Sequence, residues 1–150
     1  MNSGENRASG RILGLDVGAR RIGISVSDPL GLTAQGVTTL HRRNRRYDLG
    51  EIRKLLQEYR VTEMVVGNPL RMSGSSGTQA EKMAGFAAQL QQTFSIPVHL
   101  WDERLTTAEA HRLLDETGIS DHRRKEVIDK MAAVLILQSF LDARAANSLR

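Results

Sequence analysis

One aspartate lies where a buried β-strand predicts an apolar side chain. The segment 12–17, ILGLDV, alternates like a strand, which puts its leucines on one face and Asp16 on the other. Burying an unpaired carboxylate costs several kcal/mol, so such a group is usually ion-paired, protonated or bound to a cation. Any fold of this chain must therefore give Asp16 a partner.

Length and composition limit the class of protein. The 150 residues fit one domain with a hydrophobic core, and the absence of cysteine excludes disulfides, thiol catalysis and Cys-ligated zinc. A formal net charge of +4 favours a polyanionic partner without requiring one. Residues 1–10 have the composition of a flexible N-terminal tail without a signal-peptide core, and no apolar run is long enough to span a bilayer. We therefore expect a cytoplasmic protein with no membrane partner.

The apolar periodicity predicts an α/β fold. Strands are expected at 12–18, 21–27, 33–40, 64–66 and 97–101, and helices at about 49–59, 80–90, 106–118 and 121–144. The first two strands are close enough for an antiparallel hairpin, and the alternation that follows favours a mixed sheet with helices on both faces. A single domain is expected over residues 11–144, with a C-terminal tail at 145–150.

Three acids are candidates for one site. Asp16 ends the first strand and Glu103 follows the last, and ligands of open α/β sheets bind where parallel strands end. Asp129 lies on the apolar face of the final helix, next to small residues that allow close packing on the sheet. Three carboxylates without His or Cys suit Mg²⁺ or Mn²⁺ better than zinc. Asp16, Glu103 and Asp129 are therefore the candidate catalytic and metal-binding residues.

Each acid also has a structural interpretation that the spacing leaves open. Asp16 could organise a turn, Glu103 could cap a helix or pair with Arg104, and Asp129 could pair with an arginine of a neighbouring element. Among the basic residues, Arg20, Arg21 and Arg104 neighbour the proposed acids and are candidates for phosphate contacts. The basic clusters at 42–46 and 122–125 would also suit phosphate contacts, but charge runs are more often solvated surface, and no interleaved aromatic residues support base stacking.

Four motifs, in this order, resemble the YqgF family, also called RuvX. They are GLDVG at 14–18 with RIG at 21–23, VGNPL at 66–70, DERLTT at 102–107 and IDKMAA at 128–133. The resemblance covers residues 11–141 and implies a ribonuclease H-like fold with a five-stranded mixed sheet. It also implies a nuclease that matures the 5′ end of precursor 16S ribosomal RNA. Asn68 departs from the family pattern, in which an apolar residue is common at that position.

The resemblance carries the family's catalytic acids onto Asp16, Glu103 and Asp129. It implies that these carboxylates bind one or two Mg²⁺ or Mn²⁺ ions and that hydrolysis leaves a 5′-phosphate and a 3′-hydroxyl. Arg20, Arg21, Arg71 and Arg104 are then the expected phosphate contacts.

Two other kinds of function remain open from the sequence. One is a Holliday junction resolvase-like nuclease acting on branched DNA, and the other is a non-catalytic RNA-binding or transcription-regulating factor on the same fold. The first motif also resembles the phosphate loop of the actin, Hsp70 and sugar-kinase superfamily, but 150 residues leave no room for its second domain. The sequence does not decide between RNA and DNA, or between a monomer and a homodimer.

Overall fold

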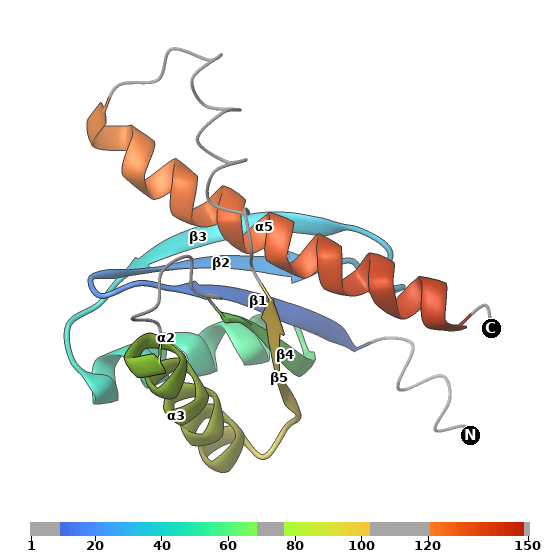
Figure 1. The fold of residues 1–150 in the computed structure, drawn as a ribbon, viewed down its shortest axis with the longest axis horizontal. Coiled ribbons are helices and arrows are strands. Elements are labelled where there is room, and N and C mark those ends of the chain that lie inside the picture. The colour runs from blue at the N-terminus through green and yellow to red at the C-terminus, as the bar shows by residue number, and fades with distance from the viewer. Residues whose placement is uncertain (1–9, 69–76, 103–120, 149–150) are drawn as a thin grey trace.

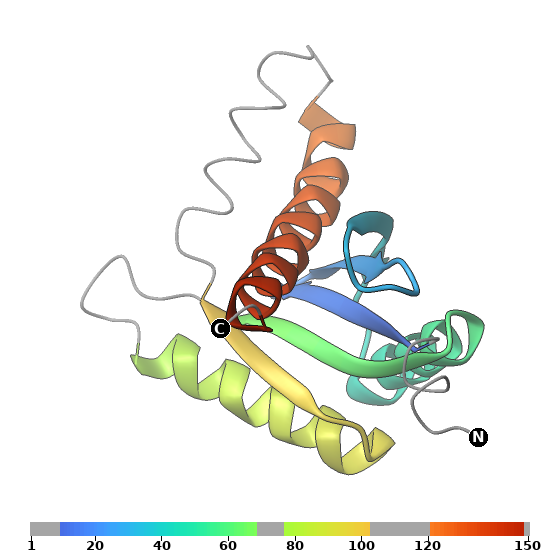
Figure 2. The ribbon, with the colours of Figure 1, turned by 90° about the vertical axis from the view of Figure 1, so that its right-hand side faces the viewer.

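The computed structural model describes residues 10–68, 77–102 and 121–148, which form a five-stranded sheet covered by helices (Figure 1). The strands are β1 (Arg11–Val17), β2 (Arg21–Ser27), β3 (Ala34–His41), β4 (Val61–Asn68) and β5 (Val98–Asp102). The helices are α2 (Arg45–Glu58), α3 (Gly77–Phe94) and α5 (Asp121–Ser148). Helices α2 and α3 cover one face of the sheet and α5 crosses the other (Figures 1 and 2). The helix predicted at 106–118 lies outside the described residues.

The sheet has the mixed topology that the sequence predicted. Its strand order is β3-β2-β1-β4-β5, with β1 antiparallel to β2, β2 antiparallel to β3, and β1, β4 and β5 parallel. The carboxyl ends of the three parallel strands therefore lie at one edge of the sheet. Asp16 is the last residue but one of β1, so it reaches this edge.

Alternation along the strands separates two layers of core. The face under α2 and α3 buries side chains such as Leu13 and Leu15, which pack with Ile52 and Leu90 of the helices. The apolar core on the other face is smaller. There Val65 packs with three apolar side chains of α5, namely Ile136, Leu137 and Phe140. Asp16 belongs to this second face, because it alternates with Leu15 along β1.

Small residues let α5 approach the sheet closely. A Cβ on Gly14 would lie 2.8 Å from the Cβ of Leu137. In the neighbouring strand, the hydroxyl of Ser25 donates a 2.8 Å hydrogen bond to the carbonyl oxygen of Ala133. Ala132 and Ala133 are themselves buried, as the apolar pattern of this helix predicted. The helix is therefore fixed on the strands that carry Asp16 and its neighbours.

Helix α5 is longer than the sequence predicted. It continues to Ser148, four residues beyond the predicted end at Arg144, so residues 145–148 of the expected C-terminal tail are helical. Arg144 donates from both terminal nitrogens to the carboxylate of Glu63 in β4, over 2.8 and 2.9 Å. His99 of β5 bonds to the same carboxylate over 2.8 Å. This ion pair anchors the last turns of the helix, a contact that local periodicity does not reveal.

Strand β4 is also longer than predicted, with eight residues in place of three. The added residues include Glu63 and Asn68, whose side chains break the apolar pattern although their backbones pair with Ile12 of β1 and Asp102 of β5. Among the residues described, no helix is both long enough and apolar enough to cross a lipid bilayer.

Candidate active site

Asp16 lies in the middle of the sheet, close to the edge where β1 ends. Its register partner in β2 is Gly23, and its own side chain is partly exposed on the face that α5 crosses. Directly opposed residues of antiparallel strands have Cα atoms about 4.5–5.5 Å apart. Whatever occupies the space above Gly23 is therefore an immediate neighbour of Asp16.

The backbone of Asp129 occupies that space. A Cβ on Gly23 would overlap the carbonyl group of Asp129, so α5 rests directly on this glycine. Gly23 thus permits a contact that no larger residue would allow, and it brings Asp129 beside Asp16. Two of the three predicted acids, 113 positions apart in the chain, thus share one neighbour: Asp16 is paired with Gly23, and the backbone of Asp129 lies on Gly23.

Arg21 pairs with Asp129. It lies two residues before Gly23 on the same face of β2, and its Nε donates to Oδ2 of Asp129 over 2.5 Å. The two side chains are 28% and 19% exposed, so the pair is half-buried and its charges are only partly screened. The structural interpretation of Asp129, an ion pair with an arginine of a neighbouring element, is thus observed. The pair occupies Oδ2, and a carboxylate has a second oxygen that can serve a cation.

The remaining candidates divide into two groups. Arg20 is exposed in the β1–β2 turn, at the same edge as Asp16. Glu103, Arg71 and Arg104 lie outside the described residues. Strand β5 ends at Asp102, the residue before Glu103, and Asp102 pairs with Asn68 at the edge where β1 also ends.

The donor set at this edge suits a hard divalent cation. Carboxylate oxygens are the ligands that Mg²⁺ and Mn²⁺ prefer, and Asp16 and Asp129 supply them from one face of the sheet. The described residues alone form no cluster of three or more His, Cys, Asp or Glu side chains, and they include two of the three predicted acids. The side-chain Oδ1 of Asn68 in β4 is also buried without a hydrogen-bond partner, but Asn68 alternates with Met64 and Val66 on the face under α2 and α3, opposite to the two acids.

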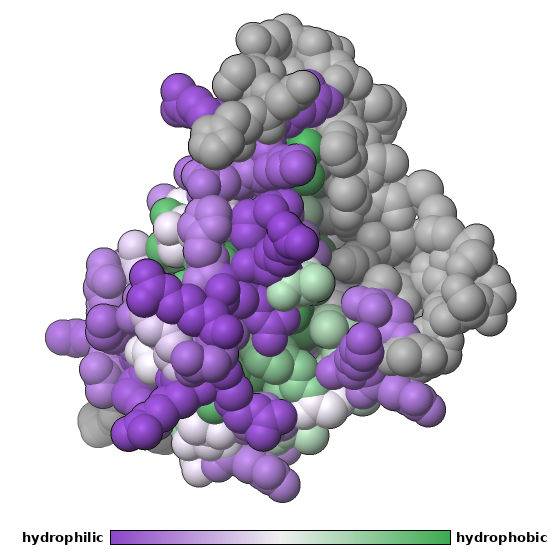
Figure 3. Space-filling model, turned by 90° about the vertical axis from the view of Figure 1, so that its left-hand side faces the viewer, coloured by the Kyte–Doolittle hydropathy of each residue, from purple (hydrophilic) through white to green (hydrophobic). Residues whose placement is uncertain are grey.

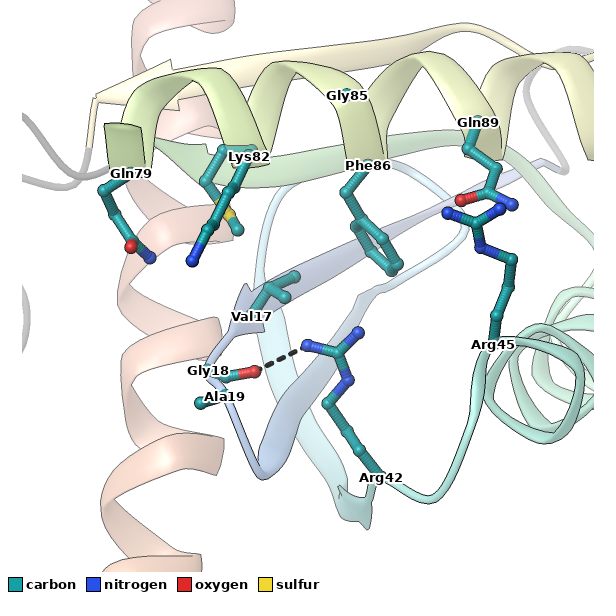
Figure 4. A pocket seen from close by; sticks show the side chains of 11 residues that line it. Val17, Gly18, Ala19, Arg42, Arg45, Gln79, Lys82, Gly85, Phe86 and Gln89 are labelled. Atoms are coloured by element: carbon teal, nitrogen blue, oxygen red, sulfur yellow. Dashed lines mark hydrogen bonds between the residues drawn. The ribbon is translucent and has the colours of Figure 1, made fainter. Parts of the chain in front are cut away.

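Sequence reasoning missed a cleft on the other face of the sheet, at the same edge. A cavity of about 440 Å³ opens between the β1–β2 turn and helix α3, and we call it the α3 cleft (Figure 4). Its lining includes Val17, Met83 and Phe86 on the inside and Arg42, Arg45 and Lys82 around them. On this side of the molecule, hydrophobic atoms lie in a hollow bordered by hydrophilic side chains (Figure 3).

Arg42 fixes one wall of the α3 cleft. Its Nε donates to the carboxylate of Asp48 over 3.1 Å, one terminal nitrogen donates to the carbonyl of Gly18 over 2.7 Å, and its guanidinium lies 5.6 Å from the ring centre of Phe86. Within the cluster 42–46, which the sequence assigned more readily to solvated surface than to phosphate contacts, Arg42 is instead partly buried and ion-paired. Asp48 was the sequence signal for this pairing. It precedes Ile52 by four residues and so lies on the buried face of the same helix, where a carboxylate needs a cationic partner.

Three comparisons with known proteins agree with this architecture. Residues 10–143 match the family described as "RuvX: Holliday junction resolvase". A protein of Koribacter versatilis is 53% identical over 138 residues, which are 92% of this chain and 90% of that protein. A protein of Moorella thermoacetica is 51% identical over 139 residues, 93% of this chain and 99% of that protein. Both carry the name "Putative pre-16S rRNA nuclease".

A solved structure shares the fold at much lower identity. RuvC of T. thermophilus, in complex with a Holliday junction substrate, superposes with a TM-score of 0.55 over 90% of this chain and 96% of RuvC. The sequences are 13% identical, so this likeness concerns the fold alone. It agrees with the ribonuclease H-like architecture that the motifs implied.

Proposed function

The chain belongs to the RuvX family, and we propose that it is a cytoplasmic nuclease that hydrolyses phosphodiester bonds in the 5′ region of precursor 16S rRNA. The observation that supports this proposal is that Asp16 is paired with Gly23 and the backbone of Asp129 lies on the same glycine, near the sheet edge where β1 and β5 both end. The names of relatives with about half of their residues identical, over nearly their whole length, support the substrate.

Asp16, Glu103 and Asp129 are the proposed catalytic residues and the proposed ligands of Mg²⁺ or Mn²⁺. Their oxygen donors and the shared edge fit such a cation. When bound, a divalent cation stabilises charge on the reacting phosphate and acidifies a water molecule. The rigid supports of Asp16 and Asp129, a central strand and a packed helix, keep both carboxylates in place before substrate arrives.

The basic residues have two proposed roles at this edge. Arg21 orients the Asp129 carboxylate through the Nε–Oδ2 hydrogen bond, and it lowers the repulsion that Asp129 would otherwise exert on Asp16 and on an approaching phosphate. Arg20 is exposed at the β1–β2 turn and is a proposed phosphate contact. Arg104, which belongs to the DERLTT motif, and Arg71, which directly follows the VGNPL motif, remain proposed phosphate contacts.

A second candidate function is cleavage of branched DNA. The description of the matching family names Holliday junction resolvases, which is the specific reason to test it. Both reactions hydrolyse phosphodiester bonds and would use the same carboxylates, so the acids do not discriminate between them. Discrimination must come from the substrate that the purified protein prefers.

The test is a cleavage assay on two substrates with and without Mg²⁺. We expect the protein to cut a 5′ fragment of precursor 16S rRNA in Mg²⁺, and to cut it faster than a four-way DNA junction. Asp129→Asn should abolish cleavage, whereas Asp142→Asn, an exposed aspartate of the same helix, should leave it unchanged. Faster cleavage of the junction would favour the second function. Cleavage of either substrate that survives Asp16→Asn and Asp129→Asn would overturn the assignment of the acids.

A further inference from the structure

The α3 cleft begins where the proposed active site ends. Val17 and Gly18, which directly follow Asp16, line it on one side, and α3 lines it on the other. Asp16 faces α5 while Val17 packs with the core under α2 and α3, so the cleft and the acids lie on opposite faces of one sheet edge. A strand of nucleic acid passing over this edge could contact both.

The chemistry of the lining matches a nucleotide. Figure 4 shows Phe86 pointing from α3 into the cleft, with Lys82 and Gln79 reaching down from the same helix. Arg45 lies across from them with its guanidinium near Gln89. Apolar and aromatic surface suits a base, amides suit the polar edges of a base, and exposed cations suit a phosphate. A volume of about 440 Å³ falls within the range of small-molecule sites.

Positive charge continues beyond the cleft along the same rim. A neighbouring depression shares Arg42 and Arg45 and adds Arg20 and Arg43. Among the described residues that line the two cavities, Asp48 is the one acidic residue, and its carboxylate is ion-paired with Arg42. The remaining cations are therefore not balanced by acids in these walls, and they would attract a phosphodiester backbone.

We propose that the α3 cleft binds one unpaired nucleotide of the substrate strand, with the base against Phe86 and its two flanking phosphates at Arg45 and Lys82, which lie on either side of Phe86 (Figure 4). This inference rests on the proposed function, since it places that nucleotide beside the bond to be cut. A base within a duplex would be unable to enter, because its faces are stacked and its edge is paired. The cleft would therefore favour single-stranded over fully paired nucleic acid next to the cleavage site.

The first experiment measures binding without cleavage. Fluorescence anisotropy with a labelled single-stranded oligonucleotide, in EDTA, reports affinity of the whole protein at several salt concentrations, with RNA and DNA probes as separate arms. Loss of one phosphate contact to a single strand reduces the magnitude of the slope of log K against log salt by about 0.7. Near 0.1 M salt this corresponds to an affinity that is about fivefold lower. We expect this for Lys82→Gln and for Arg45→Gln. Lys54→Gln, which removes an exposed lysine of α2 outside both cavities, is the matched control.

The second experiment tests whether a base enters the cleft. A probe with abasic nucleotides keeps every phosphate and removes the bases. Stacking of a base on an aromatic ring contributes about 1–3 kcal/mol, so the wild type should bind the abasic probe at least about fivefold more weakly. Phe86→Leu should lose most of this preference while binding the abasic probe normally. Gln89→Ala, a surface change that spares the core, should reduce the preference in the same direction even if Phe86→Leu does not fold.

The outcomes separate the cleft from the proposed function. The proposed nucleotide site would be overturned if Lys82→Gln and Arg45→Gln bound the probes as tightly as the wild type. It would also be overturned if both Phe86→Leu and Gln89→Ala kept the full preference for the probe with bases over the abasic probe. Neither result would bear on cleavage. The expected binding pattern in a protein that cuts neither rRNA nor DNA would support the cleft and refute the nuclease. An RNA probe bound more tightly than DNA by the wild type alone would assign the cleft to RNA, and the reverse would assign it to DNA.

Discussion

Arg21 of β2 and Asp129 of α5 form an ion pair whose Nε–Oδ2 distance is 2.5 Å. The pair joins the strand to the helix at the position where Gly23 lets the two backbones touch. Arg21 therefore has a partner within the protein, whereas the sequence suggested a direct role on substrate phosphate. Its position favours a role in holding Asp129 beside Asp16.

Arg21→Gln should reduce catalysis by misplacing Asp129. Loss of a residue that orients a metal ligand typically costs 10- to 100-fold in metal affinity or activity, so we expect at least about a 10-fold lower rate and a higher Mg²⁺ requirement. Steady-state cleavage over a Mg²⁺ titration measures both effects. A residue that acted only on stability would lower the amount of folded protein without moving the Mg²⁺ midpoint. Arg53→Gln, which removes an exposed arginine of α2 whose guanidinium lies 5.0 Å from the ring centre of Phe94, is the control.

Gly23→Ala should destabilise the fold strongly, because the added methyl group meets the carbonyl of Asp129 and neither backbone can move freely. Overpacking of this kind costs about 1–3 kcal/mol or more, and we expect the upper part of that range. Gly50→Ala is the matched control, since a Cβ there meets nothing within 4 Å. It should stabilise helix α2 by about 0.5–1 kcal/mol. Urea unfolding followed by circular dichroism measures both; equal effects of the two substitutions would contradict the close contact.

Strands β1 and β2 show how far the sequence could predict the fold. Alternation in β1 placed Asp16 opposite the leucines because side-chain direction follows the backbone with period two. Small residues in α5 predicted close packing on the sheet, which Gly23 and Ala133 now explain. Register was not predictable: the pairing of Asp16 with Gly23 depends on the turn between β1 and β2 and on the whole sheet. The α3 cleft was missed because it forms between elements that are distant in the chain.

Asn68→Val should stabilise the protein. The Oδ1 atom of Asn68 is buried without a hydrogen-bond partner, and an unpaired buried acceptor costs about 1–3 kcal/mol, which an apolar side chain avoids. Asn44→Val is the contrasting substitution, because the Oδ1 of Asn44 accepts from the backbone nitrogen of Tyr47 and caps helix α2. It should destabilise by about 1 kcal/mol. The midpoint temperatures of thermal unfolding of the two variants should therefore shift in opposite directions. A lower midpoint for Asn68→Val would show that the Asn68 amide makes hydrogen bonds in solution.

Acid sensitivity should depend on Glu63. Hydrogen bonds from Arg144, and to a lesser degree from His99, lower the pKa of Glu63 from 4.5 to about 2. A carboxyl group whose pKa falls on folding stabilises the native state above its unfolded pKa, and this contribution is lost as pH falls through the folded pKa. The stabilisation from Glu63 is therefore complete above about pH 4.5 and disappears towards pH 2.

Glu63→Gln isolates this contribution, because glutamine keeps the shape of the side chain and cannot titrate. Since the carboxylate is 22% exposed and partly screened, we expect wild type to exceed the variant by about 2 kcal/mol at pH 7. The difference should stay constant down to about pH 4.5 and then shrink as the carboxyl group of the wild type takes up its proton. Urea unfolding at a series of pH values measures it, with Glu51→Gln, half of an exposed pair with Lys54, as the control. A difference that is independent of pH between 5 and 3 would mean that Arg144 and His99 hold Glu63 through shape and hydrogen bonding without lowering its pKa.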